Sequence, residues 1–382
     1  MDNNGREVIR EKAHDLERDL VELDKRIQLE STAEAYVRRG VYYSDKGDFD
    51  RALVDFDEAV EIDPKYALAH ANRGVVYSRL DELDDAIAAF GKAIALDPKL
   101  AAAYRHRGIA YRDCGDLDRA VADFSKALKL DPKDAVAYYN RGLGYEERGD
   151  FDQALADFDK VIDLDPRNAP AFNDRGNIYY LRDDFDRALA DFDRAVDLDA
   201  RYATAYFNRA LVYHDNDDLE RALADYGKAI ELSPGSADAY AGRGAVHDLM
   251  GEHGRAVVDY TRALELNPNY AITYYYRGLN YESDGDLDRA LADFNKAVEL
   301  APQIASARIA RGALYGRMGK LELALIDLNK AVELDSSDAS AYRNRGMAHY
   351  EKGDLDRARA DFKRAIDLDP SVGEGLEDLN LE

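Results

Sequence analysis

The stretch NRGLGYEERGDFDQALADFDKVIDLDP, at residues 140–166, decides the fold because it returns along the whole chain with small changes. It aligns without gaps with RRGVYYSDKGDFDRALVDFDEAVEIDP at 38–64 and with NRGMAHYEKGDLDRARADFKRAIDLDP at 344–370. Rows of 34 residues that start at Ala33 repeat ten times and fill residues 33–372. A glycine-rich phosphate loop is needed only once, so glycines that recur along the array indicate architecture rather than a nucleotide site.

Each row has the pattern of two short amphipathic helices. Apolar or aromatic residues fall at positions 4 and 11, and then at positions 17, 20, 21, 24, 27, 28 and 30, which fits about 3.6 residues per turn. A breaker such as Gly47-Asp48 separates the two groups, since glycine can end one helix and aspartate can cap the next. A proline such as Pro64 usually closes the row. We therefore predict an all-α solenoid of ten helical hairpins.

This layout resembles the tetratricopeptide repeat family, whose repeat has the same period and has characteristic residues at positions 4, 8, 11, 20, 24 and 32. In the fourth row these positions hold Tyr138, Gly142, Tyr145, Ala154, Phe158 and Pro166. The resemblance covers residues 33–372, and the ninth row departs most, with Arg308 at position 4 and Leu328 at position 24. It implies a right-handed superhelical solenoid whose first helices line a concave groove.

Arginine occupies position 7 in all ten rows, where the family usually has leucine. Nine rows also have aspartate at position 23, and Ala89 is the exception. Because position 7 lies on the first helix and position 23 on the second, we predict a repeated Arg–Asp pair that joins the two helices of each hairpin. A half-buried guanidinium without this partner would cost several kcal/mol.

The composition is that of a folded protein with an acidic surface. The chain has 382 residues, of which 46% are hydrophobic and 34% are charged, and its formal net charge is -25. This charge argues against binding to nucleic acid or to an anionic membrane surface. The single cysteine, Cys114, leaves no intrachain disulfide and no thiolate metal site. Residues 1–19 lack the apolar region of an export signal, so we expect a cytoplasmic protein.

The segments outside the array are expected to differ from it. Within residues 1–32, a heptad seam is formed by Ile9, Ala13, Leu16, Leu20, Leu23 and Ile27. Two interpretations stay open: this helix covers the open face of the first row, or it forms a short homodimeric coiled coil. In the tenth row Arg359 replaces the aliphatic residue of position 21, which indicates a water-exposed end, and residues 373–382 follow as a short tail.

Neither catalysis nor a bound cofactor is expected. The seven histidines do not cluster, and every candidate nucleophile or base stands at a position that the repeat explains. Acidic residues at 284–288 resemble a calcium loop only in part, because the sixth position holds Arg289 instead of glycine. We therefore predict no metal site, no catalytic residue and no cofactor.

We expect the binding residues to lie on the first helices, because the resemblance places positions 2, 5, 6, 9, 12 and 13 in the groove. Asparagine occurs at position 6 in four rows, as Asn72, Asn140, Asn208 and Asn344. An amide both donates and accepts hydrogen bonds, so spaced asparagines suit the backbone of an extended ligand. A merely solvated surface is the alternative, and the sequence favours neither.

Aromatic and acidic residues gather at the same positions in the middle rows. The candidate anchors are Tyr139, Tyr180, Phe207, Tyr275 and Tyr276, although some of them can pack against a neighbouring row instead. The acidic candidates include Glu146, Asp174 and Asp215, and rows four to eight have no Lys or Arg at the groove positions. The central groove is therefore expected to favour a basic ligand with apolar side chains.

The sequence predicts two alternative functions from different classes. The first is a non-enzymatic scaffold that binds an extended peptide or a protein partner in the concave groove. The second is a structural module that self-assembles, as a homodimer through the amino-terminal helix or by end-to-end stacking of the array.

Overall fold

The computed structural model describes residues 20–373 and divides into two units, of which the first ends at Leu198 and the second begins at Asp199. The helices of the first unit are α2 Ala33–Asp45, α3 Phe49–Ile62, α4 Ala67–Arg79, α5 Leu83–Leu96, α6 Ala101–Asp113, α7 Leu117–Leu130, α8 Ala135–Glu147, α9 Phe151–Leu164, α10 Ala169–Leu181 and α11 Phe185–Leu198. Those of the second are α12 Ala203–Asp215, α13 Leu219–Leu232, α14 Ala237–Leu249, α15 His253–Leu266, α16 Ala271–Ser283, α17 Leu287–Leu300, α18 Ala305–Arg317, α19 Leu321–Leu334, α20 Ala339–Glu351 and α21 Leu355–Leu368, with the short 3₁₀ helix η1 Pro370–Gly373.

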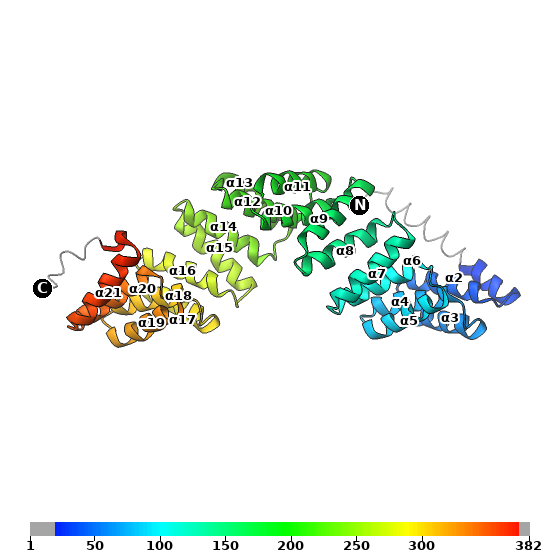
Figure 1. The fold of residues 1–382 in the computed structure, drawn as a ribbon, viewed down its shortest axis with the longest axis horizontal. Helices are drawn as coiled ribbons and strands as arrows, with labels where there is room; N and C mark the ends of the chain where they lie inside the picture. Colours follow the sequence, from blue (N-terminus) through cyan, green and yellow to red (C-terminus); the bar gives the residue numbers. More distant parts are fainter. Residues whose placement is uncertain (1–19, 374–382) are drawn as a thin grey trace. The chain divides into compact units, whose positions relative to one another are not determined.

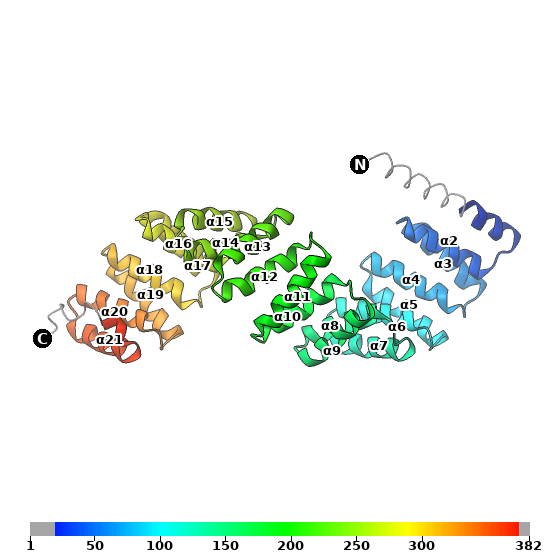
Figure 2. The same ribbon diagram turned by 90° about the horizontal axis from the view of Figure 1, so that it is seen from above.

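Consecutive helices pack as antiparallel hairpins, one hairpin for each row of the sequence, hereafter called a repeat. Within each unit, the second helix of a repeat also packs against the first helix of the next repeat (Figures 1 and 2). The residues from 20 to 373 contain no strand. The predicted all-α fold of stacked helical hairpins is therefore confirmed.

The turn inside each hairpin needs a residue in the left-handed region. Gly149 takes this conformation with φ of 79° in the fourth repeat, as glycine does in six other repeats. In the remaining three repeats an aspartate replaces the glycine, as at Asp81 with φ of 64°. Aspartate tolerates this region better than most residues do, because its short side chain can form a local hydrogen bond. The turn is thus preserved where the Gly-Asp breaker is absent.

The core of each hairpin lies where small and aromatic residues meet. In the fourth repeat Ala154, Phe158 and Val161 are completely buried, and the ring of Phe158 lies against Gly142 on the facing helix. A Cβ atom at Gly142 would lie 2.8 Å from Cε1 of Phe158, which is closer than packed carbon atoms come. Glycine at position 8 therefore allows the close approach of the two helices.

The predicted Arg–Asp pair is present in all nine repeats that have both residues. In each, Nε and Nη2 of the arginine donate to the two carboxylate oxygens at 2.6–2.9 Å. In the fourth repeat, for example, the pair joins Arg141 to Asp157, whose side chain is 6% exposed. These buried bidentate pairs fix the two helices of a hairpin against each other.

The helix before the first repeat is described only in part. Residues 20–29 are helical, and Asp24 accepts a hydrogen bond from Nη1 of Arg39 on α2 at 2.7 Å. Leu23 lines one shallow hollow together with Val41 and Tyr42 of α2. The seam residues Ile9, Ala13 and Leu16 lie outside the described residues, so the boundaries 1–32 and 373–382 and the coiled coil stay predictions.

Candidate functional site

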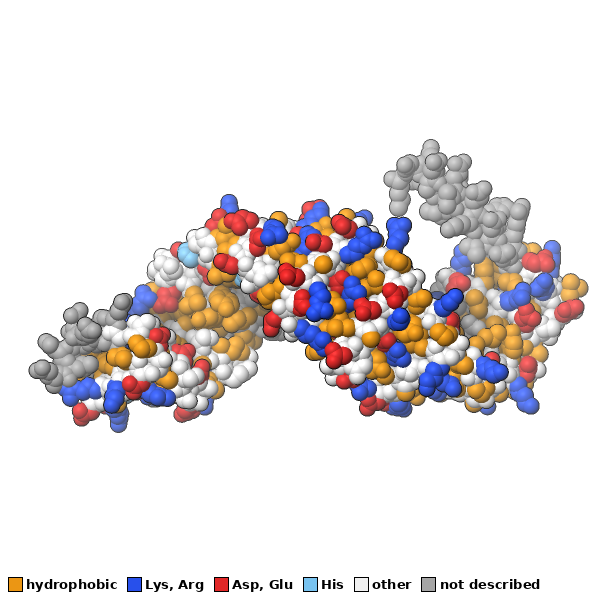
Figure 3. All heavy atoms as spheres, turned by 45° about the horizontal axis from the view of Figure 1, so that its top comes forward, with side chains coloured by type: hydrophobic (Ala, Val, Ile, Leu, Met, Phe, Trp, Pro, Cys, Tyr) orange, Lys and Arg blue, Asp and Glu red, His pale blue; other side chains and the backbone are white. Residues whose placement is uncertain are grey.

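The predicted binding residues all lie on the first helices of their repeats. They are Asn72 on α4, Tyr139, Asn140 and Glu146 on α8, Asp174 and Tyr180 on α10, Phe207, Asn208 and Asp215 on α12, Tyr275 and Tyr276 on α16, and Asn344 on α20. On the face that Figure 3 shows, basic, acidic and apolar side chains are mixed. A site must therefore be recognised from local contacts rather than from one large patch of a single charge.

Two acidic groups come together where α8 and α10 face each other in the first unit. The hydroxyl of Tyr139 donates to Oδ2 of Asp174 at 2.6 Å, and Nδ2 of Asn173 donates to Oδ1 of the same carboxylate at 3.0 Å. One turn of helix further on, Nδ2 of Asn177 donates to Oε1 of Glu146 at 3.2 Å. We call these five residues the α8–α10 patch.

The two carboxylates of the α8–α10 patch have neutral hydrogen-bond donors only. Within the described part of the chain, neither Glu146 nor Asp174 forms an ion pair with Lys, Arg or His. Burial raises the pKa of Asp174, and burial together with the nearby charge of Asp174 raises the pKa of Glu146. Their negative charges are therefore incompletely compensated inside the protein.

The asparagines are engaged with the protein to different degrees. Asn140 is only 8% exposed: Nη1 of Arg112 donates to its Oδ1 at 2.6 Å, and its Nδ2 donates to the carbonyl of Val136 at 2.7 Å. Nδ2 of Asn72 likewise donates to the carbonyl of Leu68 at 2.8 Å. The structure thus places Asn140 in a link between the third and fourth repeats, where its amide is occupied, rather than on an open surface.

The second unit has a hollow between α12, α13 and α14 that contains two of the predicted residues. It has a volume of about 290 Å³ and is lined by Ala203, Thr204, Phe207, Asn208, Ala229, Ser233, Ser236 and Asp238. Phe207 packs on Tyr226 with ring centroids 5.8 Å apart, so it forms a fixed apolar wall. We call this the α12–α14 hollow, and it combines that wall with hydroxyl, amide and carboxylate groups.

The other aromatic candidates are largely packed into the protein. Tyr139 lies beside Phe158, Tyr180 beside Phe185, and Tyr275 beside Phe294, at centroid distances of 5.9, 6.0 and 6.3 Å. Tyr276 is 40% exposed and stacks on Tyr260. Asp215 is exposed, and Asn344 is half-buried. Among the aromatic candidates, Tyr276 therefore has the most surface free for a ligand.

Several polar groups of the α8–α10 patch and of the α12–α14 hollow were not predicted from the sequence. Asn173 and Asn177 were not selected, although Asn177 at position 9 lies opposite position 12 of the preceding repeat. The hydroxyl groups of Thr204, Ser233 and Ser236 were missed as well. The useful signal is the pairing of position 9 with position 12 of the previous repeat, which only the stacking of repeats reveals.

Two further findings concern metals and membranes. Between residues 20 and 373, no three His, Cys, Asp or Glu side chains lie close enough together to hold a metal ion. None of the described helices combines the length and the apolar character that crossing a lipid bilayer requires.

Comparison with known families finds tetratricopeptide repeat models along most of the array. Models described as "Tetratricopeptide repeat" match residues 33–66, 67–100, 135–168, 203–236, 237–270, 271–304 and 309–372. A model described as "TPR repeat" matches residues 108–147 and 176–217. No curated protein matches the chain.

Several solved structures are similar to this chain. The Cut9–Hcn1 hetero-tetramer of APC/C contains a chain with 14% identity and a TM-score of 0.53, and the match covers 97% of this chain and 94% of that one. A tetratricopeptide repeat protein from Parabacteroides merdae has 24% identity and a TM-score of 0.51, over 65% of this chain and 98% of that one. YrrB, which is described as a TPR protein with an unusual peptide-binding site, has 28% identity and a TM-score of 0.42, over 48% of this chain and 95% of that one.

Proposed function

Because the chain belongs to the tetratricopeptide repeat family, we propose that it is a non-catalytic scaffold that binds an extended basic peptide segment along its first helices. Proteins of this family are in general scaffolds for interactions between proteins. The observation that carries the basic preference is the α8–α10 patch, where Glu146 and Asp174 are half-buried and have only neutral donors.

The electrostatics of the α8–α10 patch favour a cation from a ligand. An ionised carboxylate that is partly removed from water gains more from a nearby positive charge than an exposed one does. A lysine or arginine of the peptide would therefore interact with Asp174 and Glu146 more strongly than with the many exposed acidic residues of the surface. The buried Asn140 is not expected to contact the ligand, since its amide oxygen accepts a hydrogen bond from Arg112 of the preceding repeat.

The second unit offers a place of its own for the same class of ligand. In the α12–α14 hollow, Asp238 can pair with a basic side chain while Phe207 packs against its methylene groups. The amide of Asn208 lies in the same hollow and suits a peptide backbone. We expect this subsite to bind peptides of many sequences, because it contacts only a positive charge, the aliphatic part of one side chain and the main chain of the peptide.

The test is a fluorescence-polarisation titration of the full chain with two labelled peptides, one of alternating Lys and Leu and one in which Glu replaces Lys. We expect only the basic peptide to bind, and we expect the double variant Glu146→Gln/Asp174→Asn to bind it about tenfold more weakly, a loss of about 1.4 kcal/mol. The matched control is the double variant Glu147→Gln/Asp186→Asn, which also removes two negative charges but from exposed residues. Equal binding of both peptides, or equal loss in variant and control, would refute the proposal.

Self-assembly is the second candidate, and it is favoured by apolar exposure on the segment of residues 20–29. Val21 is 54% exposed and Leu29 is 83% exposed, although both lie on a helical segment that carries charged neighbours. Sedimentation of the full chain at several concentrations distinguishes the two candidates. A mass that rises with concentration, and stops rising when Val21 and Leu29 are changed to lysine, would support assembly through this segment.

A further inference from the structure

Five repeats share an arrangement of three residues at the turn between their two helices. In each, the guanidinium of the arginine at position 19 lies 4.4–4.5 Å from the ring centre of the tyrosine at position 11. The same arginine forms an ion pair with the aspartate at position 16. The pairs are Arg51–Tyr43, Arg119–Tyr111, Arg187–Tyr179, Arg221–Tyr213 and Arg289–Tyr281. A guanidinium over a tyrosine ring is a favourable cation–π contact, and here it closes the turn.

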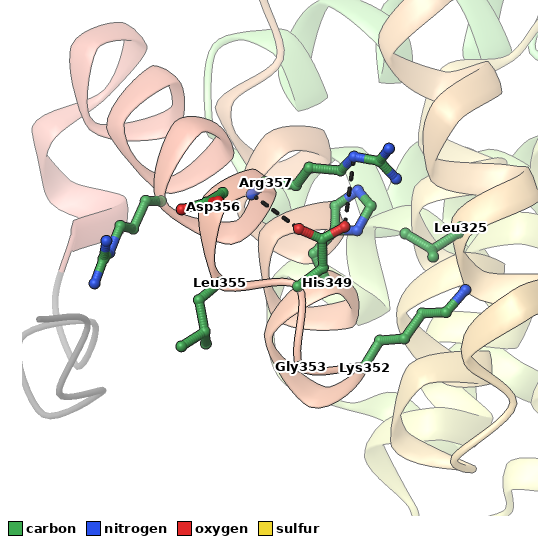
Figure 4. Close-up of a pocket in the computed structure, with 9 residues that line it drawn as sticks. Leu325, His349, Lys352, Gly353, Leu355, Asp356 and Arg357 are labelled. Atoms are coloured by element: carbon green, nitrogen blue, oxygen red, sulfur yellow. Dashed lines mark hydrogen bonds and ion pairs between the residues drawn. The ribbon is translucent and has the colours of Figure 1, made fainter.

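The tenth repeat keeps the arginine but not the tyrosine. Arg357 stands at position 19 and pairs with Asp354, while position 11 holds His349. A hollow of about 660 Å³ lies beside His349 and is lined also by Leu325 of α19 and by Lys352. In Figure 4, Leu325 and Lys352 lie to the right of His349 in this hollow, and Leu355 and Asp356 lie to its left. We call it the tenth-repeat hollow.

His349 has an unmet hydrogen-bonding capacity in this hollow. His349 is 7% exposed, and its Nδ1 is buried without a hydrogen-bond partner among residues 20–373. Asp354 is not that partner: its oxygens accept from the backbone N–H of Arg357 and pair with the guanidinium of Arg357. A buried polar atom without a partner costs free energy, so a ligand group that reaches it is favoured.

The seventh repeat shows what happens when the protein itself supplies the partner. It also has histidine at position 11, but there Nδ1 of His247 lies 2.7 Å from Oε2 of Glu252. Glutamate at position 16 is one methylene longer than the Asp354 of the tenth repeat, so it reaches the imidazole. The histidine of the tenth repeat is therefore incompletely satisfied for a local and identifiable reason.

We propose that the tenth-repeat hollow receives a tyrosine side chain of a protein partner. The incoming ring would lie under the guanidinium of Arg357, as the chain's own tyrosines lie under the matching arginines in five other repeats. Its hydroxyl would provide a partner for His349. Lys352 pairs with Glu322 and Arg357 pairs with Asp354, so the charges around the hollow are largely compensated, which suits a neutral phenol ring. None of these residues belongs to the α8–α10 patch or the α12–α14 hollow, and the site takes a different partner.

The experiment uses the full chain with p-cresol as the probe of the tyrosine side chain, and the imidazole proton resonances of the histidines as the readout. The resonance of His349 is identified by its disappearance in the variant His349→Tyr, which restores the residue common to eight repeats. We expect p-cresol to shift this resonance in a saturable manner. We also expect Arg357→Ala to raise the dissociation constant at least threefold, while Arg255→Ala, the matched change in the seventh repeat, leaves it unchanged.

The outcomes separate the possible occupants. Absence of a p-cresol shift at His349 would overturn the proposal, and so would a shift that Arg357→Ala leaves unchanged. Sodium acetate is titrated in parallel: if acetate shifts the His349 resonance and p-cresol does not, the hollow accepts a carboxylate rather than an aromatic ring, and the proposal is wrong. Toluene, which lacks the hydroxyl, should bind more weakly than p-cresol if His349 contacts the phenol.

Discussion

Replacement of Ala89 with aspartate is expected to stabilise the second repeat, because it supplies the carboxylate that the other nine repeats have. Arg73 stands opposite Ala89, which is 4% exposed, and its Nε is buried without a partner among the described residues. Its Nη1 donates to Asp57 at 2.8 Å, so only part of the guanidinium is satisfied. The natural sequence thus contains one hairpin in which the Arg–Asp pair is already broken.

The expected gain follows from the geometry of the intact pairs. An unsatisfied buried donor costs about 1–3 kcal/mol, and a new bidentate pair at 2.6–2.9 Å would remove that cost. Burial of an additional carboxylate opposes this gain, since desolvation of the charge is unfavourable. We therefore expect a net stabilisation of about 1–2 kcal/mol, which is a factor of roughly 5–30 in the ratio of closed to open states.

Hydrogen–deuterium exchange is the appropriate assay, because stability in a repeat array is largely a sum of local terms. Amides of α4 and α5 should exchange roughly 5–30 times more slowly in Ala89→Asp than in the natural chain, with little change in the second unit. The matched control is Ala88→Asp, which adds the same charge at the exposed neighbouring position. Exchange of α4 and α5 that is unchanged or faster in Ala89→Asp would refute the view that the pair stabilises the hairpin.

Three further predictions concern stability. Asp157→Ala should lower the free energy of unfolding by about 3–5 kcal/mol in urea titrations, because it leaves a half-buried guanidinium unpaired. Gly142→Ala should cost about 1–3 kcal/mol through its contact with Phe158, whereas Gly227→Ala, which meets nothing within 4 Å, should stabilise by about 0.5–1 kcal/mol. Asp174→Asn should stabilise the chain at neutral pH, because burial raises the pKa of Asp174 and makes its ionised form unfavourable in the folded state. This free-energy cost is fully present above the folded pKa and is lost as the pH falls. The urea midpoint of Asp174→Asn should therefore approach that of the natural chain near about pH 4.

The fold could be predicted from the sequence because each hairpin is decided by residues of its own row. The glycine of position 8 and the aromatic residue of position 24 meet in the same hairpin, as Gly142 and Phe158 do. The arginine of position 7 and the aspartate of position 23 also belong to one row, so the pair could be inferred from their joint recurrence. Spacing within 34 residues was sufficient for both inferences.

The candidate site could be predicted only in part, because its contacts connect different repeats. Tyr139 and Asp174 are 35 residues apart, and Arg112 and Asn140 are 28 residues apart. Whether such residues meet depends on how one hairpin is rotated against the next, which hydrophobic spacing within a row does not specify. Asn140 was therefore selected as an open amide, while the structure places its side chain in a buried link to the preceding repeat.

The framework residues at positions 7, 8, 23 and 24 recur along the array. A repeat that departs from them can therefore be compared directly with the repeats that keep them. The Arg–Asp pair is present in nine hairpins and the glycine of position 8 in nine, and neither uses positions 2, 5, 6, 9 or 12. Position 6 accordingly holds residues as different as Asn140, Asp174 and Tyr276. Substitutions at these positions affect the stability of the fold little, so their side chains can be suited to a ligand.

Substitutions at framework positions are different, because each leaves a space or an unpaired group where the other repeats have a side chain. Ala89 leaves a guanidinium without its carboxylate, and His349 leaves an arginine without its ring. The first gap lies inside a hairpin, where only a substitution can fill it, whereas the second opens to the surface, where a partner can. This difference is the reason to expect a stability effect at Ala89 and a binding function at His349.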